Sequence, residues 1–297
     1  MALIPTAPFD DRDGFIWFDG RLVPWREAKI HVLTHGLHYA SCVFEGERAY
    51  GGQIFKIKDH TDRLFKSAEL LDFKIPFSAD EISKAKRDTL AAMTLKDAYV
   101  RPVAWRGSEI MGVTAQTAKI HVAIAVWEWP SYFDPVERAK GIKLDISSWR
   151  RPGPDMAPTH AKAAGLYMIC TLSKHVAERK GYADALMFDY RGLIAEATGA
   201  NIFLIRDGVL HTPTPDCFLN GLTRQTVIAL AKRRGLTVVE RHIEAQELAS
   251  FSEVFITGTA AEVTPVAEIG PHRFTPGPIS HGLMADYDQE VRKPNPV

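Results

Sequence analysis

Lys162 stands in the segment APTHAKAAGLYMIC, residues 157–170, among some of the smallest side chains of the chain. A lysine that forms a Schiff base must be partly deprotonated near neutral pH, so its pKa must fall from about 10.4 through burial or a nearby positive charge. Small neighbours would let a planar ligand approach the amine. From this local context alone, an ordinary surface lysine in a loop is the better interpretation.

The segment NGLTRQTV offers a place for a phosphate group. A helix is predicted to begin at Gly221, and the first N–H groups, at Leu222 and Thr223, would point outward at the positive end of the helix dipole. The alternative is a plain helix N-terminus capped by Asn220 or Thr223, and the segment alone favours it.

Two further residues could contact the same anion. Thr259 follows a predicted strand in TGTAAEVTP, where a threonine beside glycine can give both a hydroxyl and an amide donor, although a simple turn is the alternative. Arg63, near the start of a predicted helix in DHTDRLF, could reach a phosphate or pair with Asp59 or Glu69 at the surface.

Glu196 and Arg101 are charged residues in apolar surroundings. In IAEATGANIF, Glu196 lies between alanines and could bond a protonated ring nitrogen or be an ordinary exposed carboxylate. In AYVRPVAWRG, Arg101 shares a strand face with Tyr99. An arginine beside an aromatic ring suits a carboxylate partner, and a buried structural ion pair is the alternative.

Three histidines, His31, His35 and His38, could place two rings on one helical face for a metal ion. No carboxylate or cysteine ligand pattern accompanies them before Cys42, so packed, hydrogen-bonded rings are the better interpretation. We expect no metal.

The candidate groups are each weak alone, but together they form a set. A lysine, a phosphate seat, an acid for a ring nitrogen and a carboxylate receptor are the parts of a pyridoxal 5'-phosphate (PLP) enzyme that acts on an amino acid. Signatures of a dinucleotide fold, a P-loop, an H-E-x-x-H metalloprotease and a nucleophile elbow are missing from the chain.

The elements that must position these residues alternate between hairpins and helices. FIWFDGRLVPW predicts two strands joined by Asp19-Gly20, and RAYGGQIFKI repeats the pattern. Helices are expected over 58–73, 78–93, about 166–180 and 221–235. This predicts an α+β fold with antiparallel or mixed sheets. A break at EWPSYFDPVE predicts a small domain over 1–130, a linker over 131–137, and a larger domain over 138–297 that carries Lys162.

Composition restricts the class of protein. The 297 residues carry 36 basic and 36 acidic side chains, which gives no electrostatic case for nucleic acid or a membrane surface as a partner. No apolar run approaches a membrane span, and the N-terminus lacks a signal-peptide pattern. Three scattered cysteines argue for a reducing compartment, so we expect a cytoplasmic protein.

The order and spacing of these segments resemble the branched-chain amino acid aminotransferases of the class IV (fold-type IV) PLP family, from about residue 14 to 291. The matching stretches are HVLTHGLHYASCVFEGERAY, HTDRLFKSA, AYVRPVAWRG, HAKAAGLY, IAEATGANIF, NGLTRQTV and TGTAAEVTPV. The resemblance implies two domains with the cofactor at the domain interface. It also implies a two-stage transfer of the amino group of L-leucine, L-isoleucine or L-valine to 2-oxoglutarate.

The resemblance also implies roles for individual residues. Lys162 would be the Schiff-base lysine and proton carrier, Glu196 would pair with the pyridine nitrogen, and Tyr167 would bond the phenolic oxygen. The phosphate would be held by Arg63, Leu222, Thr223 and Thr259. The substrate would be bound by Tyr99, Arg101, Thr259 and Ala260, with Phe44, Gly46, Val113 and Tyr132 as pocket walls. Tyr39 would be donated across the interface of a homodimer or larger homo-oligomer.

Some positions depart from the family pattern. Glu47 stands where an aliphatic residue is usual, GVTAQ lacks a common proline, and HAKAAGLY has leucine where asparagine is common. Because Glu47 and the 113–116 loop are expected to border the pocket, substrate preference stays open. Rival activities are a D-amino acid transaminase, an (R)-selective amine transaminase and an aminodeoxychorismate lyase of the same fold. From another class, the rival is a non-catalytic protein that binds PLP or a metal.

Overall fold

The computed structural model describes residues 8–129 and 135–293, which divide into two compact units. Among the described residues, 8–129 and 161–165 form the N-terminal unit, and 135–160 and 166–293 form the C-terminal unit. The expected linker at 131–137 lies largely outside the described residues. Sequence continuity alone assigned Lys162 to the C-terminal domain, whereas the short stretch 161–165 packs with the N-terminal unit.

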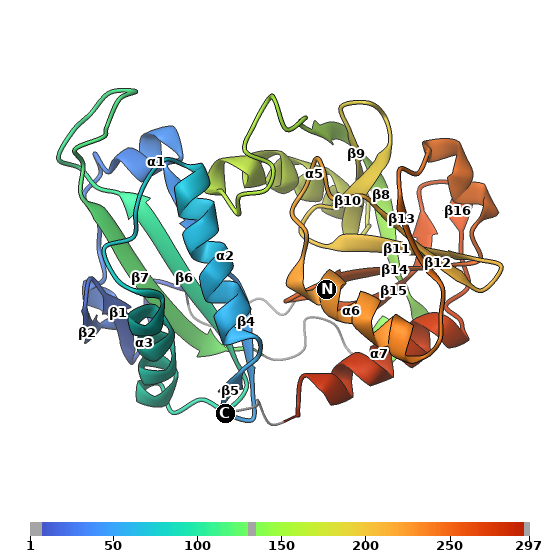
Figure 1. The fold of residues 1–297 in the computed structure, drawn as a ribbon, viewed down its shortest axis with the longest axis horizontal. Helices are drawn as coiled ribbons and strands as arrows, with labels where there is room; N and C mark the ends of the chain where they lie inside the picture. The colour runs from blue at the N-terminus through green and yellow to red at the C-terminus, as the bar shows by residue number, and fades with distance from the viewer. Residues whose placement is uncertain (1–7, 130–134, 294–297) are drawn as a thin grey trace. The chain divides into compact units, whose positions relative to one another are not determined.

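The N-terminal unit is an antiparallel sheet covered by helices. Its strand order is β2-β1-β7-β6-β4-β5, with β3 also paired to β6. The strands are β1 (Phe15–Phe18), β2 (Arg21–Pro24), β3 (Cys42–Phe44), β4 (Glu47–Tyr50), β5 (Gln53–Ile54), β6 (Ala98–Arg106) and β7 (Ile120–Glu128). The helices are the 3-10 turn η1 (Trp25–Glu27), α1 (His35–Tyr39), α2 (Ile57–Leu70) and α3 (Ala79–Ala92). Figure 1 shows α2 and α3 along one face of the sheet.

Local chemistry explains these elements. Asp19 and Gly20 both have positive φ, at 45° and 98°, which is the conformation that a tight hairpin between β1 and β2 needs. Ser78 and Glu81 form the expected capping box at the start of α3. Leu64 of α2 and Ile82 of α3 are fully buried against strand residues such as Val100, so one apolar face of each helix closes the core.

The C-terminal unit is a mixed sheet with the order β10-β9-β8-β15-β14-β11-β12-β13, and β16 pairs with β15. The strands are β8 (Ile142–Arg151), β9 (Asp184–Asp189), β10 (Ile194–Ala197), β11 (Asn201–Arg206), β12 (Val209–Pro213), β13 (Val238–Arg241), β14 (Glu253–Gly258), β15 (Glu262–Ile269) and β16 (His272–Arg273). The helical elements are α4 (Pro135–Lys140), η2 (Ala164–Tyr167), α5 (Met168–Arg179), α6 (Leu222–Arg233), η3 (Ala245–Ser250) and α7 (Pro278–Glu290).

The strand pairing of this unit closes on itself. Strand β10 pairs with β9 and also with β11, so the path from β10 through β9, β8, β15 and β14 to β11 returns to its start. Closure of this kind leaves those strands without a free edge. It brings the ends of β8, β10, β11 and β14 into one structure although they are far apart in the sequence.

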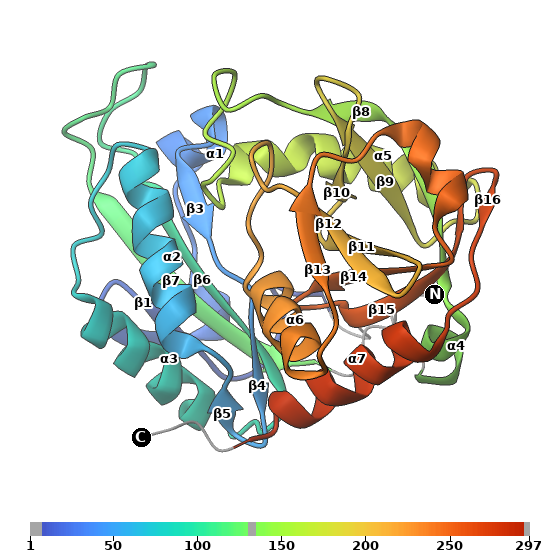
Figure 2. The ribbon, with the colours of Figure 1, turned by 45° about the vertical axis from the view of Figure 1, so that its right-hand side comes forward.

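The expected α+β class with antiparallel and mixed sheets is confirmed. The helix predicted over 221–235 is α6, and the helix predicted over 166–180 is α5 preceded by a 3-10 turn. Helix α7, which lies beside α6 in Figure 2, has no counterpart in the sequence prediction. In the part of the chain that the structure describes, none of the helices has the length and apolar character needed to cross a membrane.

Candidate active site

Lys162 is fixed by its main chain to the N-terminal unit. Its N–H donates to Ser67 Oγ at 2.9 Å, and its carbonyl accepts from Phe44 N at 3.1 Å. The neighbouring Ala163 forms an isolated bridge with Val43 of β3. The small residues around Lys162 therefore serve a close approach to β3 and α2. This excludes the interpretation of Lys162 as an ordinary exposed loop lysine.

The Lys162 amine has the electrostatic environment that a nucleophilic lysine needs. Burial is the main cause that lowers its pKa, from 10.5 to about 8, and the nearby Arg63 lowers it further, while Glu45 acts in the opposite direction. The Nζ atom lies 4.9 Å from the centre of the Phe44 ring. An amine with this pKa is partly neutral near pH 7, as proton transfer and attack on a carbonyl carbon require.

Arg63 is held rigidly by Glu45, a fully buried residue that the sequence interpretation missed. Arg63 donates from Nε to Glu45 Oε1 at 2.7 Å and from Nη2 to Oε2 at 2.8 Å, and His60 Nδ1 contacts Oε2 at 2.7 Å. Burial raises the pKa of Glu45, but the attraction of Arg63 and His60 outweighs it and keeps this pKa well below its usual range. A bidentate pair of this kind fixes the plane of the guanidinium.

Four of the proposed substrate-binding residues of this unit lie together on one sheet face: Phe44, Gly46, Tyr99 and Arg101. Arg101 Nη2 donates to the Tyr99 hydroxyl at 3.2 Å, and its guanidinium lies 4.8 Å from the Phe44 ring centre. Arg101 Nε is buried and has no hydrogen-bond partner within residues 8–129 and 135–293. A Cβ at Gly46 would lie 2.0 Å from the Tyr99 hydroxyl oxygen, so only glycine fits there.

Glu47 lies on the opposite face of the same sheet. It pairs in register with Val100, a core residue, whereas its neighbour Arg48 pairs with Tyr99. Side chains of register partners share a face, and successive residues alternate between faces. Glu47 is fully buried and lies 2.6 Å from Lys86 Nζ of α3. The expectation that Glu47 borders the same pocket as Tyr99 is therefore wrong.

Glu196 is the centre of a second group of residues, in the C-terminal unit. It is buried on β10, and its Oε1 forms an ion pair with Arg151 Nη2 at 3.1 Å. Its Oε2 accepts from Asn201 Nδ2 at 3.0 Å. Glu196 is thus not the exposed carboxylate of the alternative interpretation. Arg151 is the last residue of β8 and Asn201 is the first residue of β11, and the sequence interpretation missed both.

Arg151 connects Glu196 with Tyr167. Burial opposes the charge of Arg151, but Glu196, Cys170 and Tyr167 outweigh it and raise the pKa of the guanidinium. The Nη1 atom donates to Cys170 Sγ at 3.2 Å. Tyr167 ends the turn η2 and is the N-terminal cap residue of α5. Arg151 thus forms an ion pair with Glu196, whereas it interacts with Tyr167 only through its charge.

The N-terminus of α6 has the features of an anion seat. Its N-cap is Gly221, which provides no side-chain cap, and the first main-chain bond of the helix runs from Gln225 N to Gly221 O. Helix geometry leaves the preceding N–H groups, at Leu222, Thr223 and Arg224, without helical acceptors. Leu222 and Thr223 are buried, so these donors lie in a shielded environment.

A second set of candidate anion contacts lies at the end of β14. The hydroxyl of Thr257 is buried and has no hydrogen-bond partner among the described residues. Thr259 and Ala260, in the following turn, are half-buried. Buried hydroxyl groups usually have a hydrogen-bond partner, so the Thr257 hydroxyl, next to Gly258, is suited to donate to a bound oxyanion.

Two of the expected substrate residues are exposed and one cannot be placed. Val113 is 87% exposed and Tyr39 is 45% exposed. Tyr132 lies outside the described residues.

The three histidines are each occupied separately by the main chain. His35 Nε2 contacts Gly112 O at 2.9 Å, His38 Nε2 contacts Val32 O at 2.8 Å, and His31 Nδ1 accepts from Leu33 N. His35 is buried, whereas His31 and His38 are exposed, so the expected packing of the ring holds for His35 and not for the other two.

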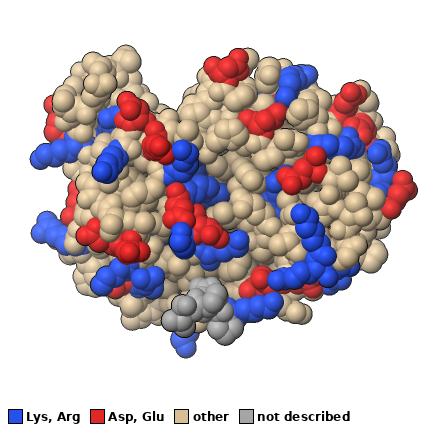
Figure 3. Space-filling view, viewed as in Figure 1, with Lys and Arg blue, Asp and Glu red and all other residues tan. Residues whose placement is uncertain are grey.

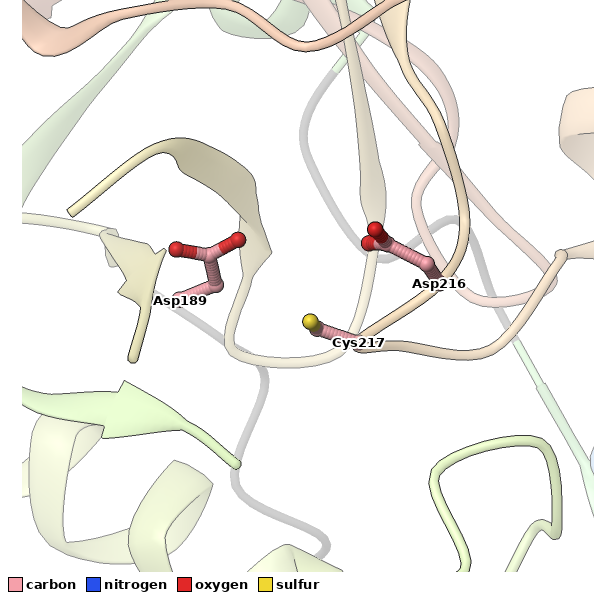
Figure 4. Close-up of side chains that lie close together, drawn as sticks. All are labelled: Asp189, Asp216 and Cys217. Atoms are coloured by element: carbon pink, nitrogen blue, oxygen red, sulfur yellow. The ribbon is translucent and has the colours of Figure 1, made fainter. Parts of the chain in front are cut away.

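One group of potential metal ligands occurs among the described residues, and Figure 4 shows its side chains directed toward one another: Asp189, Asp216 and Cys217. Arg191 Nη2 lies 2.6 Å from Asp189 Oδ2 and 2.8 Å from Asp216 Oδ2. The guanidinium thus already neutralises both carboxylates. Acidic and basic side chains are also interspersed on the face shown in Figure 3, as the zero net charge suggests.

Each unit, taken by itself, holds groups that fit a part of PLP. One unit supplies an amine with a lowered pKa and a fixed guanidinium. The other supplies a buried carboxylate held at both oxygens and an uncapped helix N-terminus. An aldehyde, a basic ring nitrogen and a phosphate ester are the chemical groups that such a set recognises.

Comparison with known proteins shows the same class of molecule. The family model "Amino-transferase class IV" matches residues 42–269. The branched-chain-amino-acid aminotransferase of Pseudomonas aeruginosa is 44% identical over 284 residues, which cover 93% of this chain and 92% of that protein.

Solved structures agree with the sequence relatives. The T.th. branched-chain amino acid aminotransferase with pyridoxamine 5'-phosphate has a TM-score of 0.92 and 38% identity, over 95% of this chain and 96% of that one. The same enzyme complexed with N-(5'-phosphopyridoxyl)-L-glutamate has a TM-score of 0.90 over the same shares of the two chains.

Proposed function

Because the chain belongs to the class IV aminotransferase family, we propose that it moves the amino group of L-leucine, L-isoleucine or L-valine to 2-oxoglutarate. It is a PLP-dependent transaminase of the branched-chain amino acid type with the two-domain α+β architecture of fold-type IV. Relatives and similar structures favour this activity over that of a D-amino acid transaminase. The observation that carries the proposal is Lys162, whose main chain is held by Ser67 and Phe44 and whose amine has a pKa lowered to about 8.

PLP would be held by residues of both units. From the N-terminal unit, Lys162 would bind the aldehyde carbon and Arg63 the phosphate. From the C-terminal unit, Leu222, Thr223 and Thr259 would donate to the phosphate. When bound, PLP supplies an electrophilic carbon that takes up the substrate amine and a ring that withdraws electron density from the α-carbon.

Lys162 would act as the base and the acid of the reaction. Its neutral amine accepts the proton that leaves the substrate α-carbon, and the resulting ammonium returns a proton in the transfer. An amine with a pKa of about 8 can do both near neutral pH, because neither protonation state is rare. Arg63 supports this role by disfavouring the ammonium, while Glu45 holds Arg63 in place.

Glu196 and Tyr167 would fix the charge pattern around the ring. Glu196 would keep a proton on the ring nitrogen, which favours loss of the α-proton, and Arg151 with Asn201 holds its two oxygens. Tyr167, coupled to the same Arg151, would donate to the phenolic oxygen. A carboxylate held on both sides keeps its orientation while the substrates exchange.

Arg101 and Tyr99 would receive the substrate carboxylate beside the apolar ring of Phe44. Arg101 Nε is buried without a partner among the described residues, and its guanidinium is already placed by the Tyr99 hydroxyl and the Phe44 ring. The glutamate adduct bound by the T.th. enzyme supports a pocket that takes an acidic substrate as well as an apolar one.

We propose that the active form is at least a homodimer in which a second copy covers an exposed apolar surface around α1. This surface includes Val32, Leu37 and Tyr39, and also Met111 and Val113. His35 Nε2 ties α1 to Gly112 at 2.9 Å, so the two segments form one surface. Five exposed apolar side chains in one place are unusual for a monomer. Tyr39 would then complete the site of the partner copy. The three free cysteines support a cytoplasmic location.

The test is the visible absorption of the purified protein with PLP during titration with L-leucine, without a 2-oxo acid. We expect the band of the bound cofactor to fall as the cofactor takes up the amino group, and 2-oxoglutarate to restore it. Lys162→Ala should lose at least about 10³-fold of this rate, because it removes both the attachment and the proton carrier. The matched control is Lys66→Ala, an exposed lysine on α2.

The outcomes separate the candidates. A band that L-leucine leaves unchanged, but that D-alanine or an (R)-amine bleaches, would replace the branched-chain activity with that of another transaminase of the fold. A chain that forms no such band would contradict the cofactor assignment.

A further inference from the structure

We propose that Asn201 is a positioning residue that fixes the Glu196 carboxylate and the N-terminus of α6 relative to each other. The inference rests on the proposed function, because it gives the two ends of one ligand, the ring nitrogen and the phosphate, a common support. Asn201 itself is placed in contact with neither end.

Asn201 stands at the junction of three strands. It pairs in register with Glu196 of β10 on one side and with Thr257 of β14 on the other. Directly opposite residues in a sheet project from the same face, so the three side chains form one row. Asn201 is 5% exposed, and its place in the row leaves it little freedom to turn.

Each end of the Asn201 amide has a partner in a different element. The Nδ2 atom donates to Glu196 Oε2 and to Leu219 O, both at 3.0 Å. The Oδ1 atom accepts from Gly221 N at 3.1 Å. Both amide N–H groups and the carbonyl are therefore used, which defines a single orientation. The amide joins the carboxylate on β10 to the loop that leads into α6.

Gly221 shows how tight this joint is. A Cβ at Gly221 would lie 2.2 Å from Asn201 Oδ1. The backbone of Gly221 is ordinary, with φ −62° and ψ 139°, so glycine is needed here for space and not for conformation. The close approach lets the Gly221 N–H reach Asn201 and sets the position where α6 begins.

Asn201 therefore fixes the distance between Glu196 and the N-terminus of α6 before a ligand binds. A rigid ligand with a ring nitrogen at one end and a phosphate at the other binds best when both receptors are held before it arrives. Arg151 holds the other Glu196 oxygen, at 3.1 Å, and also donates to Leu166 O of η2 and to Cys170 Sγ of α5. Asn201 contributes the link to the helix.

The test measures ligand fragments on the full-length apo-protein. Dissociation constants for PLP, pyridoxal and inorganic phosphate are determined for the wild type and for Asn201→Ala. Loss of hydrogen bonds to a charged group is expected to weaken PLP binding by about 10–100-fold. Both pyridoxal and phosphate should weaken, because each depends on one side of the amide. The matched control is Ser280→Ala, which removes a donor to another buried carboxylate of this unit, Glu253.

A double-mutant cycle assigns the ring side to Glu196. In a Glu196→Gln background, the additional effect of Asn201→Ala on pyridoxal should largely disappear, whereas its effect on phosphate should persist. Equal effects of Asn201→Ala on pyridoxal in the two backgrounds would show that Asn201 does not act through Glu196, and would overturn the inference.

A second pair of variants tests the helix side and does not depend on the folding of Asn201→Ala alone. Gly221→Ala should weaken phosphate binding, because its methyl group meets Asn201 Oδ1. Combining it with Asn201→Ala removes that clash and should recover part of the phosphate affinity lost by Gly221→Ala. No recovery would contradict the joint. Wild-type protein that does not bind PLP would contradict the proposed function, whereas wild-type binding with unchanged affinities in Asn201→Ala would contradict only this inference.

Discussion

Each unit of the molecule holds a buried carboxylate beside an arginine, but the two pairs are built for different ends. Glu45 of the N-terminal unit is held by two basic groups, Arg63 and His60. Glu196 of the C-terminal unit is held by the basic group of Arg151 and by the neutral amide of Asn201. In the first pair, Glu45 fixes the position of Arg63, which lies beside Lys162. In the second pair, Arg151 fixes the position of Glu196.

The comparison shows that the role of a buried ion pair depends on the group that contacts the carboxylate besides the arginine. His60 gives Glu45 a second basic neighbour, so the Glu45 carboxylate contacts His60 while it holds Arg63 in place. Asn201 adds a donor to Glu196 without adding charge, so the carboxylate retains negative charge for a ligand. The same residue types thus give a positioned cation in one unit and a positioned anion in the other.

The largest effect should come from removing each arginine. Arg151→Met removes the cation that is paired with the buried Glu196 carboxylate, and it should lower the free energy of unfolding by about 3–5 kcal/mol. Arg63→Met should cost less, about 1–3 kcal/mol, because His60 still contacts Glu45. Urea denaturation of the apo-protein measures both, with the exposed Arg233→Met as the control at about 0–1 kcal/mol. Equal costs for the two arginines would remove the distinction between the pairs.

A third buried pair, Glu47 with Lys86, sharpens the comparison because it touches none of the proposed ligand contacts. Burial raises the pKa of Glu47, and Lys86 only partly offsets this. Lys86→Met alone should destabilise the protein by about 3–5 kcal/mol, whereas Glu47→Ile with Lys86→Met should be neutral or stabilising by about 1–4 kcal/mol. Transamination by the double variant should match the wild type. A double variant less stable than Lys86→Met would show that this pair is required by the fold.

The smallest effect concerns Lys162 and pH. Its pKa in the folded protein, about 8, lies below the 10.5 of an unperturbed lysine, so the folded state disfavours its ammonium. Below pH 8, Lys162 is protonated in both the folded and the unfolded protein, and the unfavourable burial of its ammonium lowers the free energy of unfolding. Between pH 8 and 10.5 the unfolded state binds more protons, so wild-type stability gains with rising pH.

The variant Lys162→Met has no ammonium at this position, so it avoids the unfavourable burial of that charge. The full pKa shift would correspond to about 3 kcal/mol, but the side chain is only half-buried, so the apo-variant should be more stable than the wild type at pH 7 by about 1–2 kcal/mol. The difference should vanish as the pH approaches 10.5. Urea denaturation at pH 7 and pH 10 measures it, with Lys66→Met as the control. A difference that grows with pH would have the wrong sign and would mean that the folded protein stabilises the ammonium.

Much of the local structure follows from the sequence. The Asp19-Gly20 hairpin, the Ser78 capping box and the start of α6 after Gly221 depend on neighbours a few residues away, and all three occur where local chemistry predicts them. Helix α7 was missed because Gly282 and a weakly periodic apolar pattern hide it, although Pro278 at its first turn is a start signal. The roles of Lys162, Glu196 and Tyr167 came from the resemblance and remain predictions.

The family, the α+β class and the residue types that PLP chemistry needs could all be predicted from the sequence. The reason is that the motifs and the periodicity of hairpins and helices depend on residues that are close together in the chain. Tertiary structure alone decided which partner each charged residue meets. It turned Glu47 toward Lys86, placed Glu45 behind Arg63, and brought Arg151 and Asn201 to the two oxygens of Glu196. The physical reason is that strand register and sheet closure select the face and the neighbours of a side chain. These depend on pairings between segments that lie far apart in the chain.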